Sequence, residues 1–167
     1  MTTGHIRMRI LRLIVPLLFS YLAVSMVADA EDLYFTATGQ EDGKPLIFRS
    51  IAAVPEEVSK RALPYLITVS WRYEPTTQGM PSSEVNEAQI EFEDALSPLD
   101  RNKIGRQMLV VTGNGHKDWY WYVKDPDAWK TQAEHLVERS TYPISITTTD
   151  DRDWSLYENF KASVKGL

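Results

Sequence analysis

Three aspartates near the C-terminus form the densest group of carboxylates in the chain. Asp150, Asp151 and Asp153 directly precede a segment with helical periodicity. A calcium-binding loop needs glycine at its sixth position, but counting from Asp151 that position is Leu156. We therefore expect one aspartate to cap the following helix and another to lie in its first turn, where the helix dipole favours anions. Hydrolysis by this cluster is the alternative, and it requires another carboxylate across a cleft.

Histidine is the other candidate for acid–base chemistry. His116 follows the turn 113–115, and His135 lies within a helical segment beside glutamates. Because imidazole titrates near neutral pH, His116 is a candidate general base, although an exposed turn residue is the simpler interpretation. The chain has no cysteine, no His-Glu-x-x-His pattern, no Gly-x-Ser-x-Gly elbow and no phosphate loop. The sequence therefore names no catalytic residue, and we expect no metal and no cofactor.

The elements that position these residues follow from hydrophobic periodicity. Segment 66–73 alternates as a strand, and apolar residues from Val85 to Leu99 recur at helical spacing after an N-cap at Ser82 or Ser83. Further strands are predicted at 107–112, 118–124 and 142–149, with a hairpin turn at 113–115 and a second helix after Asp125. The order strand, helix, strand, strand, helix, strand indicates an α+β fold, a ferredoxin-like βαββαβ sandwich over about 64–149.

Additional elements flank this core within a single domain, 31–167. Strands at 33–38 and 45–52 around a turn at 39–43 predict an N-terminal β-hairpin, and a short helix is expected from about Val54 to Leu63. A C-terminal helix is predicted to bury a stripe formed by Trp154, Tyr157, Phe160 and Val164.

A candidate binding face follows from the alternation of the two central strands, 66–73 and 118–124. Ile67, Val69 and Trp71 should face the helices, as should Trp119 and Trp121. The opposite, open face would then present hydroxyls, rings and cations that can act jointly on one ligand: Thr68, Ser70, Arg72, Tyr120, Tyr122, Lys124, Ser145 and Thr147. We expect Tyr120 and Tyr122 to stack on a ring, and Arg72 or Lys124 to pair with a carboxylate. The alternative is that the face is solvated, or is covered by residues 31–53.

Several segments occur in an order that resembles a known family. The chain is similar to the bacterial family catalogued as domain of unknown function 695 over about 43–160, on the segments 67–73 (ITVSWRY), 119–123 (WYWYV), 142–144 (YPI) and 151–157 (DRDWSLY). The family has no established activity. Relatives are sometimes joined to a domain resembling the inhibitor of ribonuclease E, which implies regulatory binding rather than catalysis.

The N-terminal thirty residues resemble a secretory signal peptide. Arg7, Arg9 and Arg12 precede an apolar run from Leu13 to Val27, and Ala28-Asp29-Ala30 has the small-x-small pattern of a cleavage site. The run is short of the roughly 20 apolar residues that a membrane anchor needs. We therefore expect a periplasmic or secreted protein that has no membrane attachment after cleavage.

Charge narrows the possible partners of the mature chain. Residues 1–30 contain three of the 18 basic and one of the 23 acidic residues, so their removal leaves a net charge of −7. An acidic domain is poorly suited to nucleic acid. Three functions stay open: a non-enzymatic binding or regulatory domain with a protein or small-molecule partner in the envelope, an envelope hydrolase using His116 or the aspartate cluster, and an accessory protein that pairs through a sheet edge.

Cleavage after Ala30 is the first testable prediction. N-terminal sequencing and intact mass of the exported protein should show a chain that begins at Glu31. An exported chain that begins at Met1 would contradict both the assignment of the signal peptide and the charge of −7.

Overall fold

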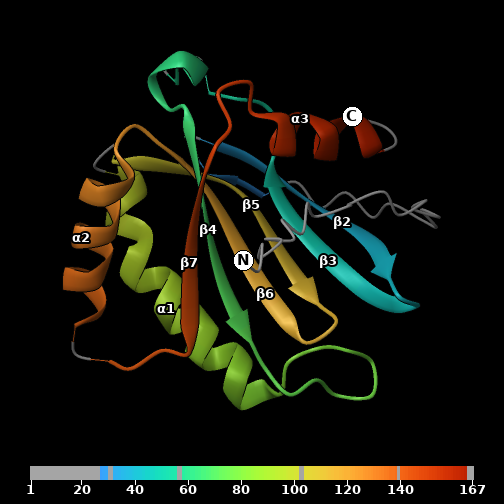
Figure 1. Cartoon of the computed structure of the whole chain (residues 1–167). Helices are drawn as coiled ribbons and strands as arrows, with labels where there is room; N and C mark the ends of the chain where they lie inside the picture. Colours follow the sequence, from blue (N-terminus) through green and yellow to red (C-terminus); the bar gives the residue numbers. More distant parts are fainter. Residues whose placement is uncertain (1–26, 30–31, 56–57, 102–103, 139, 165–167) are drawn as a thin grey trace, which may run out of the picture.

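The computed structural model describes residues 27–29, 32–55, 58–101, 104–138 and 140–164. Its strands form one sheet in the spatial order β1-β2-β3-β5-β6-β4-β7, and every neighbouring pair is antiparallel (Figure 1). The strands are β1 (Val27–Asp29), β2 (Asp32–Glu41), β3 (Lys44–Ile51), β4 (Tyr65–Arg72), β5 (Gly105–Gly113), β6 (His116–Val123) and β7 (Ile144–Asp150). Residues 1–26 and Ala30 of the predicted signal peptide lie outside the described residues.

Helices cover both faces of this sheet. Helices α1 (Ser83–Arg101) and α2 (Pro126–Val137) pack together on one face, and α3 (Ser155–Ser163) lies on the other (Figure 1). The Asp125 carboxylate accepts hydrogen bonds from the amides of Asp127 and Ala128 at 3.0 Å, which is the predicted N-cap of α2. None of the helices in the described part of the chain is long and apolar enough to cross a membrane.

The α+β class is confirmed, but the sheet is larger than predicted. The N-terminal hairpin continues the sheet, because β3 pairs with β5 from Leu46↔Gly113 to Ser50↔Leu109. The strand order of the whole sheet is therefore not the four-stranded order expected for the ferredoxin-like sandwich. Within it, β4 and β6 are neighbours, with β5 and β7 on either side of the pair.

Two tight turns join the hairpin strands. Asp42 and Gly43 have φ of 51° and 74°, and Asn114 and Gly115 have φ of 46° and 78°. Positive φ at both central residues is the two-residue turn that matches the twist of antiparallel strands. The observed turn is thus shorter than the predicted turn at 39–43, because β2 continues to Glu41.

The short helix predicted between Val54 and Leu63 is wrong in the part of this segment that the structure describes. Only a single 3-10 turn, η1 (Lys60–Ala62), is present. Val54, Val58 and Leu63 are half-buried against the sheet, so the segment follows the surface of the core, and Pro64 prevents the last turn from continuing.

Between the sheet and α1 and α2 lies the first hydrophobic cluster. Trp119 and Trp121 of β6 are each only 1% exposed and face these helices, as predicted. Phe92 of α1 makes edge-to-face contacts with Trp71 and Trp119, with ring centroids 6.0 and 5.1 Å apart. Trp121 packs against Trp129 of α2 with ring centroids 5.5 Å apart. The aromatic side chains therefore join the sheet to both helices.

A second hydrophobic cluster fills the opposite face of the sheet. The predicted arrangement, with both helices on one side, would leave this face open. Tyr120 and Tyr122 point away from α1 and α2 as predicted, but they are only 9% and 0% exposed. The stripe of α3 covers this face, and Phe160 packs on Phe35 of β2 and Phe48 of β3. At Tyr122 the face is therefore covered rather than solvated. The element that covers the ring is α3, and not the N-terminal hairpin as the covered alternative predicted.

Because both faces of β6 are buried, truncating a ring on either face should destabilise the protein. We expect Trp121→Ala and Tyr122→Ala each to lower the free energy of unfolding by about 3–5 kcal/mol, because each truncation leaves a cavity in one of the two clusters. Denaturant unfolding measures both values, and Lys124→Ala, which follows the same strand and is exposed, should change little. A small loss for Tyr122→Ala alone would show that α3 does not cover this face.

Candidate functional site

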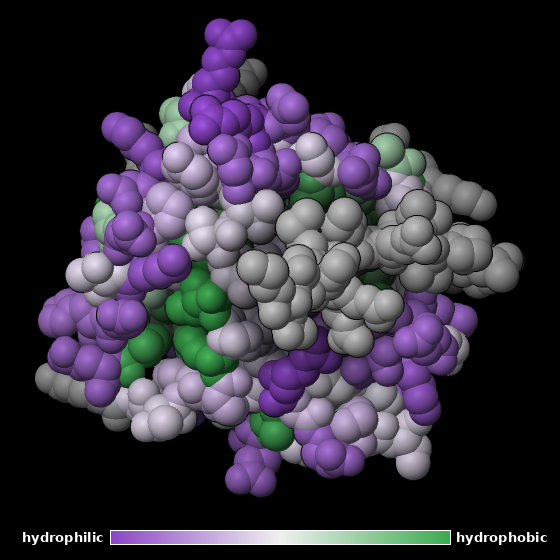
Figure 2. Space-filling view, in the orientation of Figure 1, coloured by the Kyte–Doolittle hydropathy of each residue, from purple (hydrophilic) through white to green (hydrophobic). Residues whose placement is uncertain are grey.

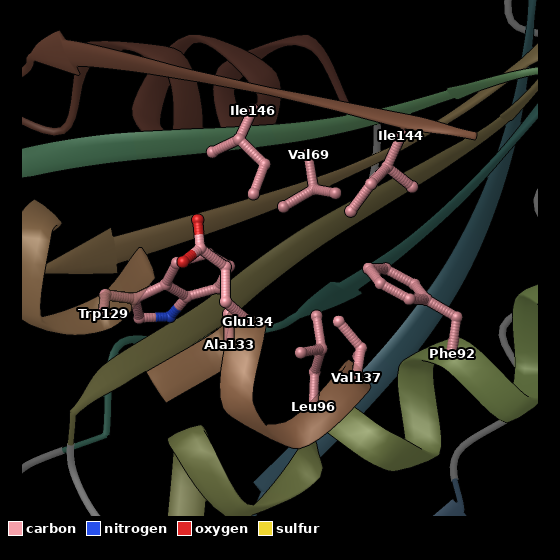
Figure 3. Close-up of a pocket in the computed structure, with 9 residues that line it drawn as sticks. All are labelled: Val69, Phe92, Leu96, Trp129, Ala133, Glu134, Val137, Ile144 and Ile146. Atoms are coloured by element: carbon pink, nitrogen blue, oxygen red, sulfur yellow. The ribbon is translucent and has the colours of Figure 1, made fainter. Parts of the chain in front are cut away.

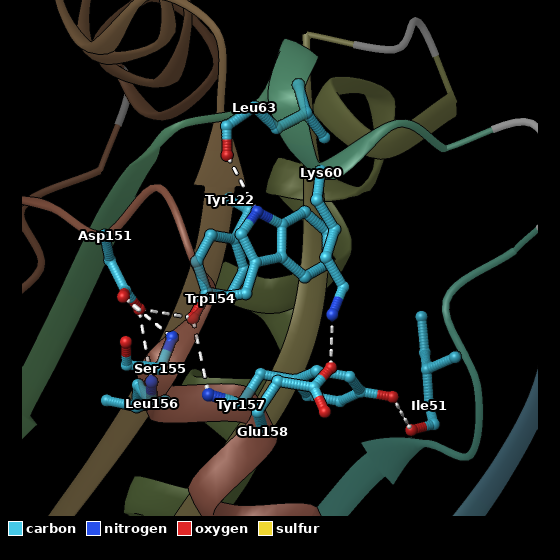
Figure 4. A network of polar contacts seen from close by, with 10 residues as sticks. All are labelled: Ile51, Lys60, Leu63, Tyr122, Asp151, Trp154, Ser155, Leu156, Tyr157 and Glu158. Carbon is cyan, nitrogen blue, oxygen red and sulfur yellow. Dashed lines mark hydrogen bonds and ion pairs between the residues drawn. The ribbon is translucent and has the colours of Figure 1, made fainter.

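Tyr122 is part of the attachment of α3 rather than of an open surface. Its ring stacks on Trp154 with centroids 4.0 Å apart and planes 12° apart. Its hydroxyl donates a hydrogen bond to the Asp151 carboxylate at 2.7 Å and accepts one from the amide of Tyr157 at 3.3 Å (Figure 4). Burial and the hydrogen bond to Asp151 raise the pKa of Tyr122 above its ordinary value. No face of this ring is free for a ligand.

Asp151 caps the last helix, as the sequence predicts, but the prediction of a second aspartate in the first turn is wrong, because the acidic residue there is Glu158. The two carboxylate oxygens of Asp151 accept hydrogen bonds from the amides of Ser155 at 2.7 Å and Leu156 at 3.2 Å. Burial acts to raise the pKa of Asp151, but the hydrogen bonds from Tyr122, Leu156 and Ser155 outweigh it and hold the pKa below its ordinary value. The carboxylate is thus held as an anion at the helix N-terminus.

Three further contacts attach α3 to distant parts of the chain (Figure 4). The indole of Trp154 donates a hydrogen bond to the carbonyl of Leu63 at 2.9 Å, and the hydroxyl of Tyr157 donates one to the carbonyl of Ile51 at 2.8 Å. Lys60 and Glu158 form an ion pair. Beside the cap, Asp150 pairs with Arg152 at 2.9 Å and Asp153 is exposed, so the three aspartates do not share one site.

Arg72 and Lys124 lie at opposite ends of the sheet. Arg72 pairs with His116 at one end of the β4–β6 ladder, whereas Lys124 follows Val123, which pairs with Tyr65 at the other end. Eight residue steps along the strand separate the two positions, which corresponds to roughly 26 Å. The two cations therefore cannot act on one small ligand.

A polar strip occupies the Arg72 end of the face opposite α1 and α2. We define it as Arg72, His116, Asp118 and Tyr120, the last three of which alternate along β6. The Tyr120 hydroxyl donates a hydrogen bond to Asp118 Oδ2 at 3.3 Å, and His116 Nε2 lies 3.7 Å from the same oxygen. Arg72 is exposed and no described residue forms an ion pair with it, whereas the His116 and Asp118 side chains are 14% and 16% exposed. The strip therefore contains an exposed guanidinium, Arg72, next to a carboxylate and an imidazole that contact each other.

Neighbouring turns hold the strip in place. The Asn114 side chain donates a hydrogen bond to Glu41 Oε2 at 3.1 Å, and the amide of Gly115 donates one to the carbonyl of Gly79 at 3.1 Å. The amide of Tyr73 donates a hydrogen bond to the carbonyl of Gly115 at 3.0 Å. Loop 74–81 and the β2–β3 turn are thereby joined to the start of β6, where His116 lies. The sequence analysis identified His116 but no partner for it. The partner, Asp118, could have been found from its spacing, because residues i and i+2 of a strand lie on the same face.

A second polar cluster, on the helix side of the sheet, was missed by the sequence analysis. Glu93 of α1 pairs with Arg49 of β3, lies 3.6 Å from Lys117 Nζ and accepts a hydrogen bond from the Trp119 indole at 3.0 Å. Burial, assisted by the charge of Arg49, lowers the pKa of Lys117 to about 8. Because only 8% of the Lys117 side chain is exposed, we assign this cluster to holding α1 against the sheet rather than to chemistry on a ligand.

One apolar hollow opens between α2 and β7 (Figure 3). Its cavity volume is about 30 Å³, and its lining comes from α1, α2, β4 and β7: Val69, Phe92, Leu96, Trp129, Ala133, Glu134, Val137, Ile144 and Ile146. Within the residues that the structure describes, no three histidine, aspartate or glutamate side chains converge as metal ligands.

The cap of α3 predicts a specific pH dependence of stability. Because the folded-state pKa of Asp151 is depressed, its contribution is fully present above its ordinary pKa of about 4 and is lost as the pH falls through the lower, folded value. We expect Asp151→Asn to lower the free energy of unfolding at pH 7 by about 1–2 kcal/mol, because the amide removes the anion at the helix N-terminus and one of the two acceptor oxygens. The deficit should shrink below pH 4 in a denaturation series.

The matched control is Asp150→Asn, because Asp150 is exposed and pairs only with the exposed Arg152 in the described part of the chain. This control should lose much less stability at pH 7. An equal deficit for the two variants, or a deficit for Asp151→Asn that does not change with pH, would contradict the assigned cap.

A family model described as a family of unknown function, DUF695, matches residues 33–161. The match includes β3 to β7, all three helices except the end of α3, and every residue of the polar strip. No curated protein and no solved structure matches the chain. Because the matched residues make up most of the chain, it belongs to the DUF695 family, whose function is unknown.

Proposed function

We propose that the protein is an exported, non-enzymatic binding domain, and that its polar strip binds a small ligand carrying a carboxylate. Arg72 carries this proposal. It is an exposed guanidinium without an ion-pair partner among the described residues, and it stands opposite His116 in the β4–β6 ladder. A guanidinium presents a fork of N–H donors that matches a carboxylate.

Export is supported by the sequence of residues 1–30. The basic start, the apolar run and the Ala-Asp-Ala site occur in the order expected of a signal peptide. All the described residues of both hydrophobic clusters lie at or after Tyr34, so none of them is lost with residues 1–30. After export, the ligand would be a component of the envelope or an imported molecule.

The four strands β5-β6-β4-β7 with α1 and α2 support a ferredoxin-like core within the larger sheet. The two crossovers, β4–α1–β5 and β6–α2–β7, place both helices on one face, which is the arrangement of the βαββαβ motif. In the mature chain of this proposal β1 is removed with the signal peptide, β2 and β3 extend the core beyond β5, and α3 covers the face that the motif leaves bare. The polar strip then lies at the end of the two central strands.

The hydrolase alternative depends on the contact between His116 and Asp118. Their 3.7 Å separation exceeds a hydrogen bond, and Asp118 Oδ2 already accepts a hydrogen bond from Tyr120. Ser70 pairs with Asp118 across the ladder while His116 pairs with Arg72, so the serine stands beside the carboxylate and not beside the imidazole. A nucleophile needs its base within hydrogen-bonding reach, and the strip therefore favours binding over catalysis.

Binding can be tested with ligands that differ only in the carboxylate. Glucuronate and glucose form one pair, and acetyl-alanine and its amide form another. In a titration followed by NMR, we expect the carboxylate of at least one pair to shift the amide signals of Arg72 and His116, and its neutral partner not to. Arg72→Ala should weaken this binding about tenfold or more, because it removes a hydrogen bond to a charged group.

Lys124→Ala is the matched control, since it removes an exposed cation at the far end of the same sheet and should leave binding unchanged. Binding that survives Arg72→Ala, or the absence of shifts with either carboxylate, would refute the proposed site. Turnover of glucuronides or peptides that is lost in His116→Ala would instead support the hydrolase.

A further inference from the structure

The open edge of the sheet at β7 lies beside the apolar hollow, and the two features together fit one kind of partner. We propose that an extended peptide segment adds to β7 as a further strand and places a small aliphatic side chain in the hollow and a basic side chain against Glu134. This surface is separate from the polar strip, and the proposal does not depend on the carboxylate ligand.

The edge of β7 has unused backbone groups. In the part of the chain that the structure describes, β7 pairs with β4 alone, from Tyr65↔Asp150 to Trp71↔Ile144. Edge strands are usually protected by lysine, proline or a bulge, and none of these occurs between Ile144 and Thr149. The outer N–H and C=O groups of β7 can therefore accept an added strand, and such main-chain hydrogen bonds supply affinity in strand-addition complexes.

The hollow lies where such a strand would direct its side chains. Ile144 and Ile146 of β7 face the helices and are half-buried, while Val69, Phe92 and Leu96 form a buried floor. Figure 3 shows Val137 and Ala133 of α2 on the side of the hollow opposite these isoleucines. Residues directly opposite in a sheet share a face, so a residue placed opposite Ile144 or Ile146 would point into the gap between β7 and α2.

The size and polarity of the hollow define the side chain that it takes. Its cavity volume of about 30 Å³ is larger than the roughly 10–15 Å³ that one water molecule needs by the same measure, so the hollow takes a small group of a few heavy atoms. Its lining is apolar except for Glu134, so it favours an aliphatic side chain over a polar one. Figure 2 shows hydrophobic side chains gathered in a hollow over β7, on the side toward α2. Valine or alanine fits this volume, whereas an aromatic ring does not.

Charge complementarity identifies the neighbouring residue of the segment. The Glu134 carboxylate extends from α2 toward Ile146 (Figure 3), and no described residue forms an ion pair with it. Glu138, one turn later, is 57% exposed and contacts only His135 at 3.3 Å among the described side chains. The Glu134 carboxylate at the hollow favours arginine or lysine two residues away from the aliphatic side chain, on the same face of the added strand.

The probe is an acetylated and amidated heptapeptide, Thr-Arg-Thr-Val-Thr-Arg-Thr, which places Arg, Val and Arg on one face. By NMR we expect it to shift the amide signals of β7 and to slow hydrogen exchange at the outward amides of this strand. Replacing its Val with Trp should abolish binding, and replacing both Arg with Glu should do the same. Absence of protection on β7, or equal binding of the three peptides, would overturn the proposal.

Variants of the protein separate the hollow from the surrounding surface. Val137→Phe plugs the hollow and should abolish binding, whereas Leu136→Phe, at the adjacent exposed position, should not. Glu134→Lys should weaken binding about fivefold, the effect expected for exposed charges, and Glu87→Lys on α1 should leave it unchanged. Unchanged denaturation midpoints establish that the variants are folded. Equal affinities for the Val137 and Leu136 variants would exclude the hollow as the site.

Discussion

Four consecutive aromatic residues on β6, Trp119 to Tyr122, impose the constraint on which the rest of the structure depends. Side chains of a strand alternate between its two faces, so these residues send two indoles to one side of the sheet and two phenols to the other. Both sides must then be kept from water, because large rings contribute most when they are fully buried. The two indoles are covered by α1 and α2, and the Tyr122 ring on the other side requires an additional layer.

That additional layer is α3, and polar contacts fix where it lies. The hydroxyl of Tyr122 is buried and needs a partner, which Asp151 supplies while it also caps the helix. The buried indole N–H of Trp154 donates a hydrogen bond to the carbonyl of Leu63. This bond holds the segment before β4 against α3. The widened sheet contributes as well, because Phe35 and Phe48 extend the apolar surface on which Phe160 rests.

Local patterns in the sequence allowed most helices and strands to be predicted. They did not predict which parts of the sheet stay exposed after the elements have packed. Alternation in β4, the turn at Asn114-Gly115 and the cap at Asp125 each depend on a few neighbouring residues, and all three appear as expected. The position of α3 depends on hydrogen bonds between residues 91 and 106 positions apart, for which the sequence contains no local pattern. The wide separation of Arg72 and Lys124 was implied by antiparallel pairing, which places the start of β4 beside the end of β6.

Aromatic packing on both faces also determines where recognition can occur. The centre of each face is filled by rings with little or no exposed area, so among the described residues the exposed groups of the central strands lie toward the margins of the sheet. At one end of the central strands the packing gives way to Arg72, His116 and Asp118. At the β7 edge the side chains of α2 do not fill the space over Ile144 and Ile146, and a hollow is left beside unpaired backbone. The same packing that removes the broad open face is thus the reason why both proposed sites lie at its margins, one at the strand ends and one at the β7 edge.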